Sequence, residues 1–330
     1  MRPQSLGPTC LRAVAAIIPL YLATAVPSAH AQSFPDKPVR VMVAFPPGGL
    51  VDTYARTLQP RLAEAFGQQV VIENRGGAGG TLAEATLAKT APDGYTVMMS
   101  GDSIPSNPHL YKGLSYDLFR DLLPVSMLAR VPLTLVVHPS VPASNAAEFA
   151  AWARTRPGQV TYGSPGTGTS NQFTAELFKQ AARFEMTHVP YKGGGQVMTD
   201  LVGGQITASF TSVFIAQQQV KGGKLKSIGV ASERRSALLP EAPTFIEAGY
   251  KDFVYGSWSG LFVPAGTPQA VVNRLHADFV KALRAPDVEG RLRDLGTEAV
   301  ASPPAEFAAF LRAEHDKLGR LIRDLNITVN

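Results

Sequence analysis

The sequence feature that most constrains the fold is the stretch Val39–Asp52, VRVMVAFPPGGLVD. Valines alternate along its first five residues, a pattern typical of a strand. Two prolines end this strand, and Gly48-Gly49 allow a turn without side-chain crowding. Apolar residues then recur at helical spacing over Val51–Phe66, with Asp52 placed to accept free N–H groups in the first helical turn. Such a strand–turn–helix unit leaves backbone N–H groups free to bind an anion, although a plain structural turn fits this segment equally well.

Residues 1–31 have the pattern of a secretory signal peptide. Two arginines precede an apolar stretch that is too short, and too broken by Pro19, to span a membrane. Small residues at Ala29 and Ala31 match a cleavage site, so we expect export with cleavage before Gln32. The only cysteine lies inside this segment. The mature chain is therefore expected to have no disulfide, no cysteine-ligated metal and no thiol nucleophile.

Charge and histidine spacing exclude several classes of function. The whole chain carries a formal charge of +5, and the mature chain carries +3 because the signal contains two arginines and no acid. A charge this small and evenly spread does not indicate a nucleic-acid partner. The histidines have no metal-ligand spacing, and motifs such as G-x-S-x-G and H-E-x-x-H are absent. We therefore expect no metal, no cofactor and no catalytic residue.

The mature chain repeats the strand–turn–helix unit. Gly76–Gly80 opens a second unit, but its spacing does not match the dinucleotide-binding pattern G-x-G-x-x-G. Ser164–Ser170 forms another glycine-rich turn between a strand and a helix. This alternation indicates an α/β fold with parallel sheets, divided into two α/β lobes. We place residues 32–131 and 256–330 in the first lobe and residues 132–255 in the second.

The chain is expected to pass between the lobes twice, near Pro132 and near Tyr255–Ser259. Around the first passage, two separate strands are predicted at Val125–Ala129 and Leu133–His138, interrupted by the proline. Pro286 is expected to end a helix. Two passages restrict the relative motion of the lobes to a hinge, and ligands favour the crevice beyond the carboxyl ends of the strands.

Glycines and hydroxyl-bearing side chains gather at the ends of strands in both lobes. Gly48-Gly49 and Ser100–Ser103 lie in the first lobe, and the second contributes Ser164–Ser170, Tyr191 and Thr211-Ser212. Such groups bind a carboxylate through neutral donors without reacting with it. Each hydrogen bond to a charged group contributes about 1.5–3 kcal/mol net. Several of them, after ordering costs, leave about −8 kcal/mol, which corresponds to a micromolar complex.

Seven motifs occur in one consistent order along the chain: Phe45–Asp52 (FPPGGLVD), Gln68–Gly80 (QQVVIENRGGAGG), Ala91–Thr96 (APDGYT), Asn107–Tyr111 (NPHLY), Tyr162–Gly168 (YGSPGTG), His188–Gly193 (HVPYKG) and Trp258–Pro268 (WSGLFVPAGTP). In these motifs the mature chain resembles the Bug family, the periplasmic substrate-binding proteins of tripartite tricarboxylate transporters. The resemblance implies a two-lobe, type II-like Venus-flytrap fold that closes on a small carboxylate. It also implies a periplasmic monomer that serves a multi-span membrane permease or a sensor kinase.

The resemblance also assigns roles to residues of this chain. Pro47, Gly48 and Gly49 are implied to hold one end of the carboxylate ligand, largely through ordered water. The turn of the second lobe is implied to grip the other end, through Ser164, Thr167, Gly168, Thr169 and Ser170. Tyr191 and Ser103 are implied to be walls of the site, and the strand-end pair Thr211-Ser212 completes the predicted set.

Two departures from the family pattern bear on the ligand. The family often has Gln-His where this chain has Asn171-Gln172. Family members that bind amino acids tend to carry an acid just after the strand Ile206–Phe210, where this chain has Thr211-Ser212. We therefore expect a carboxylate ligand without an α-amino group. The alternative function is an exported hydrolase or lyase that uses Ser164 or Ser259 as its nucleophile.

Overall fold

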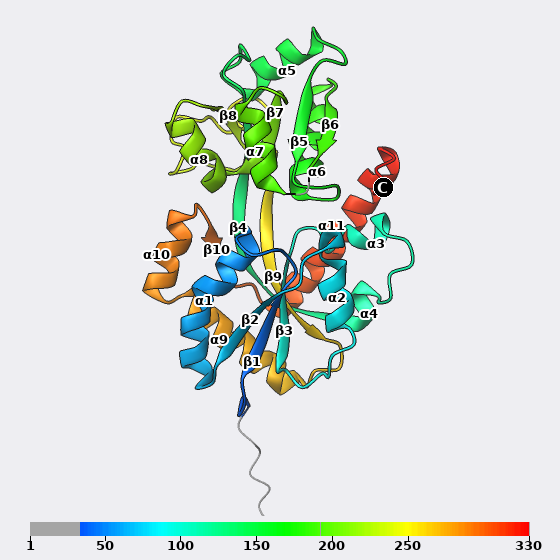
Figure 1. The fold of residues 1–330 in the computed structure, drawn as a ribbon, viewed down its shortest axis with the longest axis vertical. Coiled ribbons are helices and arrows are strands. Elements are labelled where there is room, and N and C mark those ends of the chain that lie inside the picture. Colours follow the sequence, from blue (N-terminus) through cyan, green and yellow to red (C-terminus); the bar gives the residue numbers. More distant parts are fainter. Residues whose placement is uncertain (1–33, 192, 330) are drawn as a thin grey trace, which may run out of the picture. The chain divides into compact units, whose positions relative to one another are not determined.

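The computed structural model describes residues 34–191 and 193–329, which belong to one compact unit. The predicted signal peptide and its cleavage point lie outside the described residues. Strands and helices alternate as the sequence predicts, and ten strands join in one sheet that has two parts (Figure 1). No helix among the described residues combines the length and the apolar character needed to cross a membrane.

The first part of the sheet has the strand order β2-β1-β3-β9-β4. Its strands are β1 (Val39–Val43), β2 (Val70–Asn74), β3 (Thr96–Gly101), β4 (Leu122–Val137), β9 (Gly256–Pro264) and the short β10 (Glu298–Ala299). β1 runs parallel to β2 and β3, whereas β9 is antiparallel to both β3 and β4. The parallel strands therefore end at one common edge, where the turn after β1 and the turn after β3 lie.

The second part of the sheet continues from the far end of β4. There β4 pairs with β7 (Ala208–Ser212) and β8 (Lys226–Val230), and β7 is followed by β5 (Thr161–Ser164) and β6 (Thr187–Pro190). β5 runs parallel to both β6 and β7. The turn that follows β5 therefore also lies at a carboxyl edge, as the turn after β1 does.

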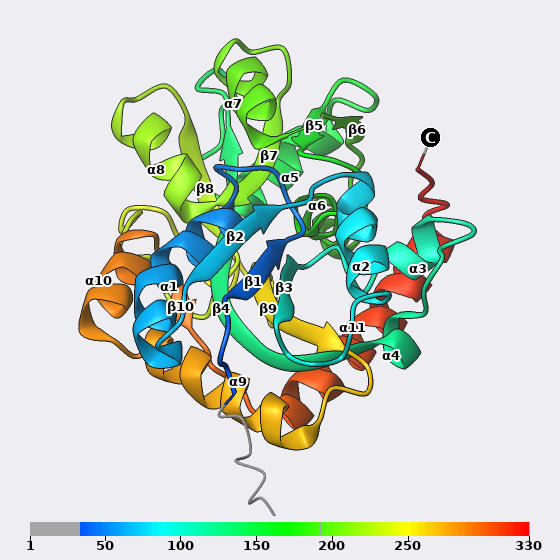
Figure 2. The same ribbon diagram turned by 60° about the horizontal axis from the view of Figure 1, so that its bottom comes forward.

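Helices cover both faces of each part, as Figure 2 shows from below. In the first part, apolar side chains of α1 (Leu50–Phe66), α9 (Gln269–Leu283) and α10 (Pro286–Asp294) pack on one face. α2 (Thr81–Leu87) and α11 (Pro304–Asp324) pack on the other. In the second part, α5 (Ala146–Arg154) and α6 (Ser170–Ala182) cover one face, and α7 (Gly194–Val202) and α8 (Val213–Lys221) cover the other. The short elements are η1 (Ala78–Gly80), α3 (Asn107–Leu110) and α4 (Leu118–Asp121).

One prediction about prolines is wrong and another is confirmed. The strands expected on either side of Pro132 are one strand, β4, of 16 residues. Pro132 pairs with Gly256 of β9 alone, so its missing N–H falls on a side of the strand that has no ladder partner. α9 ends at Leu283, before Pro286, as predicted. Pro286 also opens α10, because proline fits the first helical position, where no N–H partner is required.

β4 and β9 lie side by side where the two parts of the sheet meet (Figure 1). Their backbones are tightly packed at this point, since a Cβ atom on Gly256 would lie 2.5 Å from the Val131 carbonyl oxygen. Only glycine permits this approach. The paired strands therefore form a defined connection between the two parts.

Candidate functional site

The turn between β1 and α1 exposes the beginning of a 17-residue helix. Gly49 is the N-cap residue of α1 and offers no side chain to cap it. Gly48 adopts a φ of +80°, and its N–H donates to the Asp52 carboxylate at 2.9 Å. Asp52 therefore has a structural role, although its backbone donor precedes the helix and does not belong to the first helical turn as predicted. The first turn of α1 itself has no side-chain cap to accept from its N–H groups.

Asp52 is held in its charged form. Burial by itself would raise the pKa of this carboxyl, but hydrogen bonds from Arg56, the Gly48 N–H and Asn74 outweigh burial and lower it. The ionised Asp52 carboxylate therefore holds the turn in place through its hydrogen bond from the Gly48 N–H.

The turn between β5 and α6 is built in a similar way. Thr169 is the N-cap residue of α6, yet its hydroxyl donates to the Gly166 carbonyl at 2.9 Å and does not cap the helix. Gly168 has a φ of +83°, and its N–H donates to Gln172 Oε1 at 2.8 Å. The hydroxyl of Ser170 is buried and has no hydrogen-bond partner. The first turn of α6 therefore also lacks a side-chain cap.

A hydrogen-bond chain with a fixed direction holds this second turn. The Gly168 backbone N–H can only donate, and it donates to the side-chain oxygen of Gln172. The amide nitrogen of Gln172 must then donate to His188 Nδ1 at 3.2 Å, which places the imidazole proton on Nε2. His188 Nε2 donates to Ser164 Oγ at 2.7 Å, and Ser164 passes its own proton to the Gly166 carbonyl at 2.8 Å.

The direction of these hydrogen bonds argues against Ser164 as a nucleophile. A general base must accept the hydroxyl proton, but His188 donates to Ser164 rather than accepting from it. The second nitrogen of the imidazole meets an amide and not a carboxylate. The Ser164–His188 pair is therefore a structural brace for the turn, and the network gives Ser164 no activation.

The same network predicts a pH-dependent stability. Burial, assisted by the positive charge of Lys179, lowers the pKa of His188 to about 4. In the unfolded chain the imidazole has a pKa of about 6.5. A depressed pKa in the folded state gives stability that is present above pH 6.5 and lost as pH falls toward 4, by up to about 3 kcal/mol. Urea unfolding between pH 7 and 4.5 should show this loss, and His188→Gln should flatten it. An equal pH slope in the two proteins would contradict the assignment.

Three contacts join each turn to the opposite part of the molecule. Leu50, directly after Gly49, packs against the apolar cores of both parts of the sheet. Ser106, in the segment between β3 and α3, donates from Oγ to the Gly168 carbonyl at 3.1 Å. Leu110 of α3 is so close to Gly168 that a Cβ there would lie 2.3 Å from Leu110 Cδ1. Each turn thus faces the opposite part of the molecule.

Among the remaining predicted residues, three hydroxyls have hydrogen-bond partners. Ser103 donates to the Gly79 carbonyl at 2.6 Å. Tyr191 donates to Asp200 at 2.7 Å, and its ring packs in the same core cluster as Leu50. Ser212 caps α8 by accepting from the Ile215 N–H at 3.3 Å. Thr211 is buried beside it in β7, whereas Pro47 and Gly48 are exposed and Thr167 is partly buried.

Sequence reasoning missed three residues at this site. Gln172 and His188 support the second turn through the hydrogen-bond chain described above. Asp102 follows the last residue of β3, and its Oδ2 is buried without a hydrogen bond. The hydroxyls of Ser100 and Ser259, on the paired strands β3 and β9, are likewise buried without a partner. An acid directly after a fully buried strand was the available signal for Asp102.

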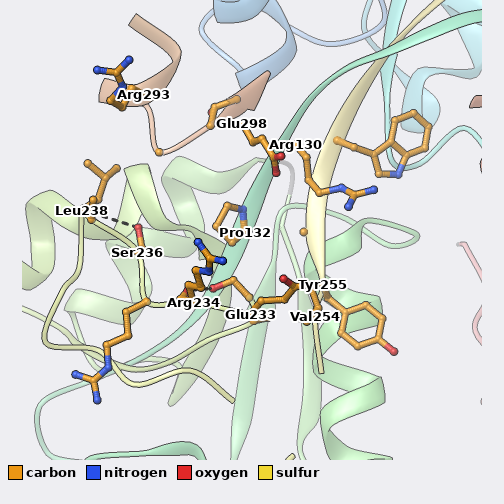
Figure 3. Close-up of a pocket in the computed structure, with 18 of the residues that line it drawn as sticks. Arg130, Pro132, Glu233, Arg234, Ser236, Leu238, Val254, Tyr255, Arg293 and Glu298 are labelled. Carbon is orange, nitrogen blue, oxygen red and sulfur yellow. Dashed lines mark hydrogen bonds between the residues drawn. The ribbon is translucent and has the colours of Figure 1, made fainter. Parts of the chain in front are cut away.

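A separate cavity of about 830 Å³ lies beside the strand connection (Figure 3). It is lined by parts of β4, β9, β10, α10 and α11 and by the loop after β8. Eight of its 21 lining residues are charged: Arg130, Arg234, Arg235, Arg293, Lys317, Glu233, Glu298 and Glu314. None of the predicted site residues lines this cavity. Among the described residues, no group of three or more His, Cys, Asp or Glu is arranged to hold a metal ion.

Comparison with known proteins identifies the family. Residues 54–327 match the model of the tripartite tricarboxylate transporter family receptor. The chain is 32% identical to the protein BugT of Bordetella pertussis, over 94% of this chain and 96% of that protein. A solved periplasmic transporter is 36% identical with a TM-score of 0.81, covering 90% of this chain and 100% of that one. An R. palustris protein solved with adipate is 30% identical with a TM-score of 0.81 at the same coverage.

These matches confirm both the predicted family resemblance and the predicted fold class, an α/β periplasmic-binding-protein fold with two lobes. The chain therefore belongs to the tripartite tricarboxylate transporter receptor family of periplasmic binding proteins, and it is a binding receptor rather than an enzyme.

Proposed function

We propose that this protein, exported by its cleaved N-terminal signal, captures a small carboxylate between the turn 46–50 and the turn 164–170. The observation that carries this proposal is that α1 and α6 both begin at glycine-rich turns without side-chain caps, and that each turn faces the other part of the molecule. The two lobes would be residues 32–131 with 256–330, and residues 132–255. Their approach around the ligand would be a hinge motion about β4 and β9.

Physical chemistry supports a carboxylate at these turns. The first-turn N–H groups of a helix lack intrahelical acceptors, and the helix dipole places partial positive charge there. Two such helix ends can supply the several charged hydrogen bonds that a micromolar complex requires. Ser170 adds a buried hydroxyl without a partner. The relative solved with adipate is consistent with a ligand that has carboxylates at both ends.

Delivery of the bound carboxylate would follow from closure. A closed form presents a surface that the open form lacks, and a multi-span permease or a sensor kinase can distinguish the two forms through it. The receptor would act as a monomer.

Ligand-dependent thermal stability tests the proposed function. A ligand that binds only the folded state stabilises it by about 2.7 kcal/mol at a concentration a hundred times Kd. We expect the melting temperature to rise with the concentration of one or more mono-, di- or tricarboxylates, without turnover of chromogenic esters. A panel of carboxylates that leaves the melting temperature unchanged at millimolar concentration would contradict the proposal.

A further inference from the structure

Among the described residues, Asp102 is the one acid with a buried carboxyl oxygen that has no hydrogen-bond partner. It directly follows β3, at the same sheet edge as the turn after β1. Its Oδ2 has less than 1 Å² of exposed surface and no hydrogen-bond partner. A buried carboxyl oxygen without a partner is costly, so a group absent from the protein itself is expected to satisfy it.

The side chains that shift the pKa of Asp102 are two hydroxyls and one acid. The hydroxyls of Ser170 on α6 and Ser257 on β9 lie close enough to lower its pKa, although Ser170 Oγ forms no hydrogen bond of normal geometry with it. Burial has the larger effect and raises the pKa of Asp102, and the negative charge of Glu314 raises it further.

Several ionisable groups on α1 and α11 have partners other than Asp102. Tyr54 of α1 shares a hydrogen bond of 2.7 Å with Thr297. On α11, Lys317 is paired with Glu314 at 2.6 Å, and His315 Nδ1 meets the Pro105 carbonyl at 3.0 Å. None of the described ion pairs neutralises Asp102 from these elements.

We propose that Asp102, together with the hydroxyls of Ser170 and Ser257, binds a protonated nitrogen of the ligand and so selects a carboxylate that also carries an ammonium group. This inference rests on the proposed function, because the carboxylate half of the ligand occupies the same site.

Ser170 connects the proposed carboxylate site at the start of α6 with Asp102. Its backbone N–H belongs to the first turn of α6, where the ligand carboxylate would sit, and its side chain lies beside Asp102. A purely anionic ligand there would place two carboxylates against one another, which forces one of them to take up a proton. An ammonium next to the ligand carboxylate removes this repulsion. It has three donors, and Asp102 Oδ2 and the two serine hydroxyls offer three acceptors.

The assignment replaces the expectation of a ligand without an amino group. That expectation assumed that the acid for an ammonium would follow the strand Ile206–Phe210. The structure supplies an acid from the end of β3 instead, opposite α6. Asp102 is thus a specificity-determining residue of the proposed site.

Calorimetric titration with matched ligand pairs tests the inference. The probes are L-aspartate with succinate, and L-glutamate with glutarate, in which only the ammonium differs. We expect an amino acid to bind the wild-type protein at least tenfold more tightly than its partner at pH 7. Asp102→Asn should weaken the amino acid at least tenfold and leave the dicarboxylate unchanged or tighter. Asp294→Asn, an exposed carboxylate on α10, is the matched control and should change neither.

The pH dependence gives a second readout. Affinity for the amino acid should fall as pH is lowered through the pKa of Asp102, because a proton then competes with the ammonium. If a dicarboxylate binds more tightly than its amino acid, and Asp102→Asn strengthens or preserves all binding, this inference is overturned while the proposed function stands. If neither these four ligands nor any other carboxylate binds, the proposed function fails and the inference fails with it.

Discussion

Thr169→Asp should raise the melting temperature of the ligand-free protein and weaken carboxylate binding more than about a hundredfold. Aspartate is a favoured N-cap, and Thr169 already has the extended conformation of an N-cap residue, with φ −85° and ψ 156°. A carboxylate at this position would take the first-turn N–H groups of α6 and stabilise the helix by about 0.5–2 kcal/mol. It would also occupy the anion site and repel the ligand. The loss of two charged hydrogen bonds, at about 1.5–3 kcal/mol each, accounts for the expected factor.

Two control variants distinguish the effect of capping α6 from the effect of adding a negative charge. Thr169→Asn also caps α6 but carries no charge, so it should weaken binding less than Thr169→Asp. Asn145→Asp changes a residue that already caps α5 through the Glu148 N–H, outside the proposed site, and should leave affinity unchanged. Thermal melting and calorimetry on the four proteins measure both effects. Full affinity in Thr169→Asp would show that the ligand does not use the start of α6.

Phe178→Ala should lower the free energy of unfolding by about 3–5 kcal/mol. Phe178 is fully buried on α6, where it forms the centre of the aromatic core of the second part of the sheet. Its ring lies within 6.3 Å of six other aromatic rings: Phe149, Phe184, Phe210, Phe245, Tyr250 and Phe253. Removal of the ring loses transfer free energy and leaves a cavity that surrounding rings fill only in part. α6 also carries the second turn, so ligand affinity should fall as well.

Phe214→Ala is the matched control for this prediction. Phe214 lies on α8 and is 41% exposed, so its removal should change the free energy of unfolding by no more than about 0.5 kcal/mol. Urea titration of both variants against the parent measures the difference. Equal losses in the two variants would contradict the placement of Phe178 at the centre of the core.

Much of the fold can be predicted from the sequence because its units are local. In β1 and α1, the alternation of valines, the glycine turn and the helical spacing all lie within 28 residues, from Val39 to Phe66. The continuous strand β4 could not be predicted in this way. Pro132 is compatible with a strand only because β9 alone pairs with it there, and that fact depends on a partner more than 120 residues away.

The candidate site also combines features that are local in the sequence with features that depend on distant segments. Its two turns carry glycines and hydroxyls in short patterns, so Gly48, Gly49 and the stretch Ser164–Ser170 were named from sequence. The roles of Asp102 and His188 depend on contacts with distant segments. The Asp102 carboxyl matters because α6 brings Ser170 beside it, and His188 matters because β6 places it against Ser164. Such pairings follow from topology and not from local spacing.

The structure of the protein crystallised with a bound carboxylate tests the central claim most directly. The account predicts electron density for the ligand between Gly49 and Thr169, with its carboxylate within hydrogen-bond distance of the first-turn N–H groups of α6. Density for the ligand in the cavity between Arg130 and Arg234, with both turns unoccupied, would contradict it.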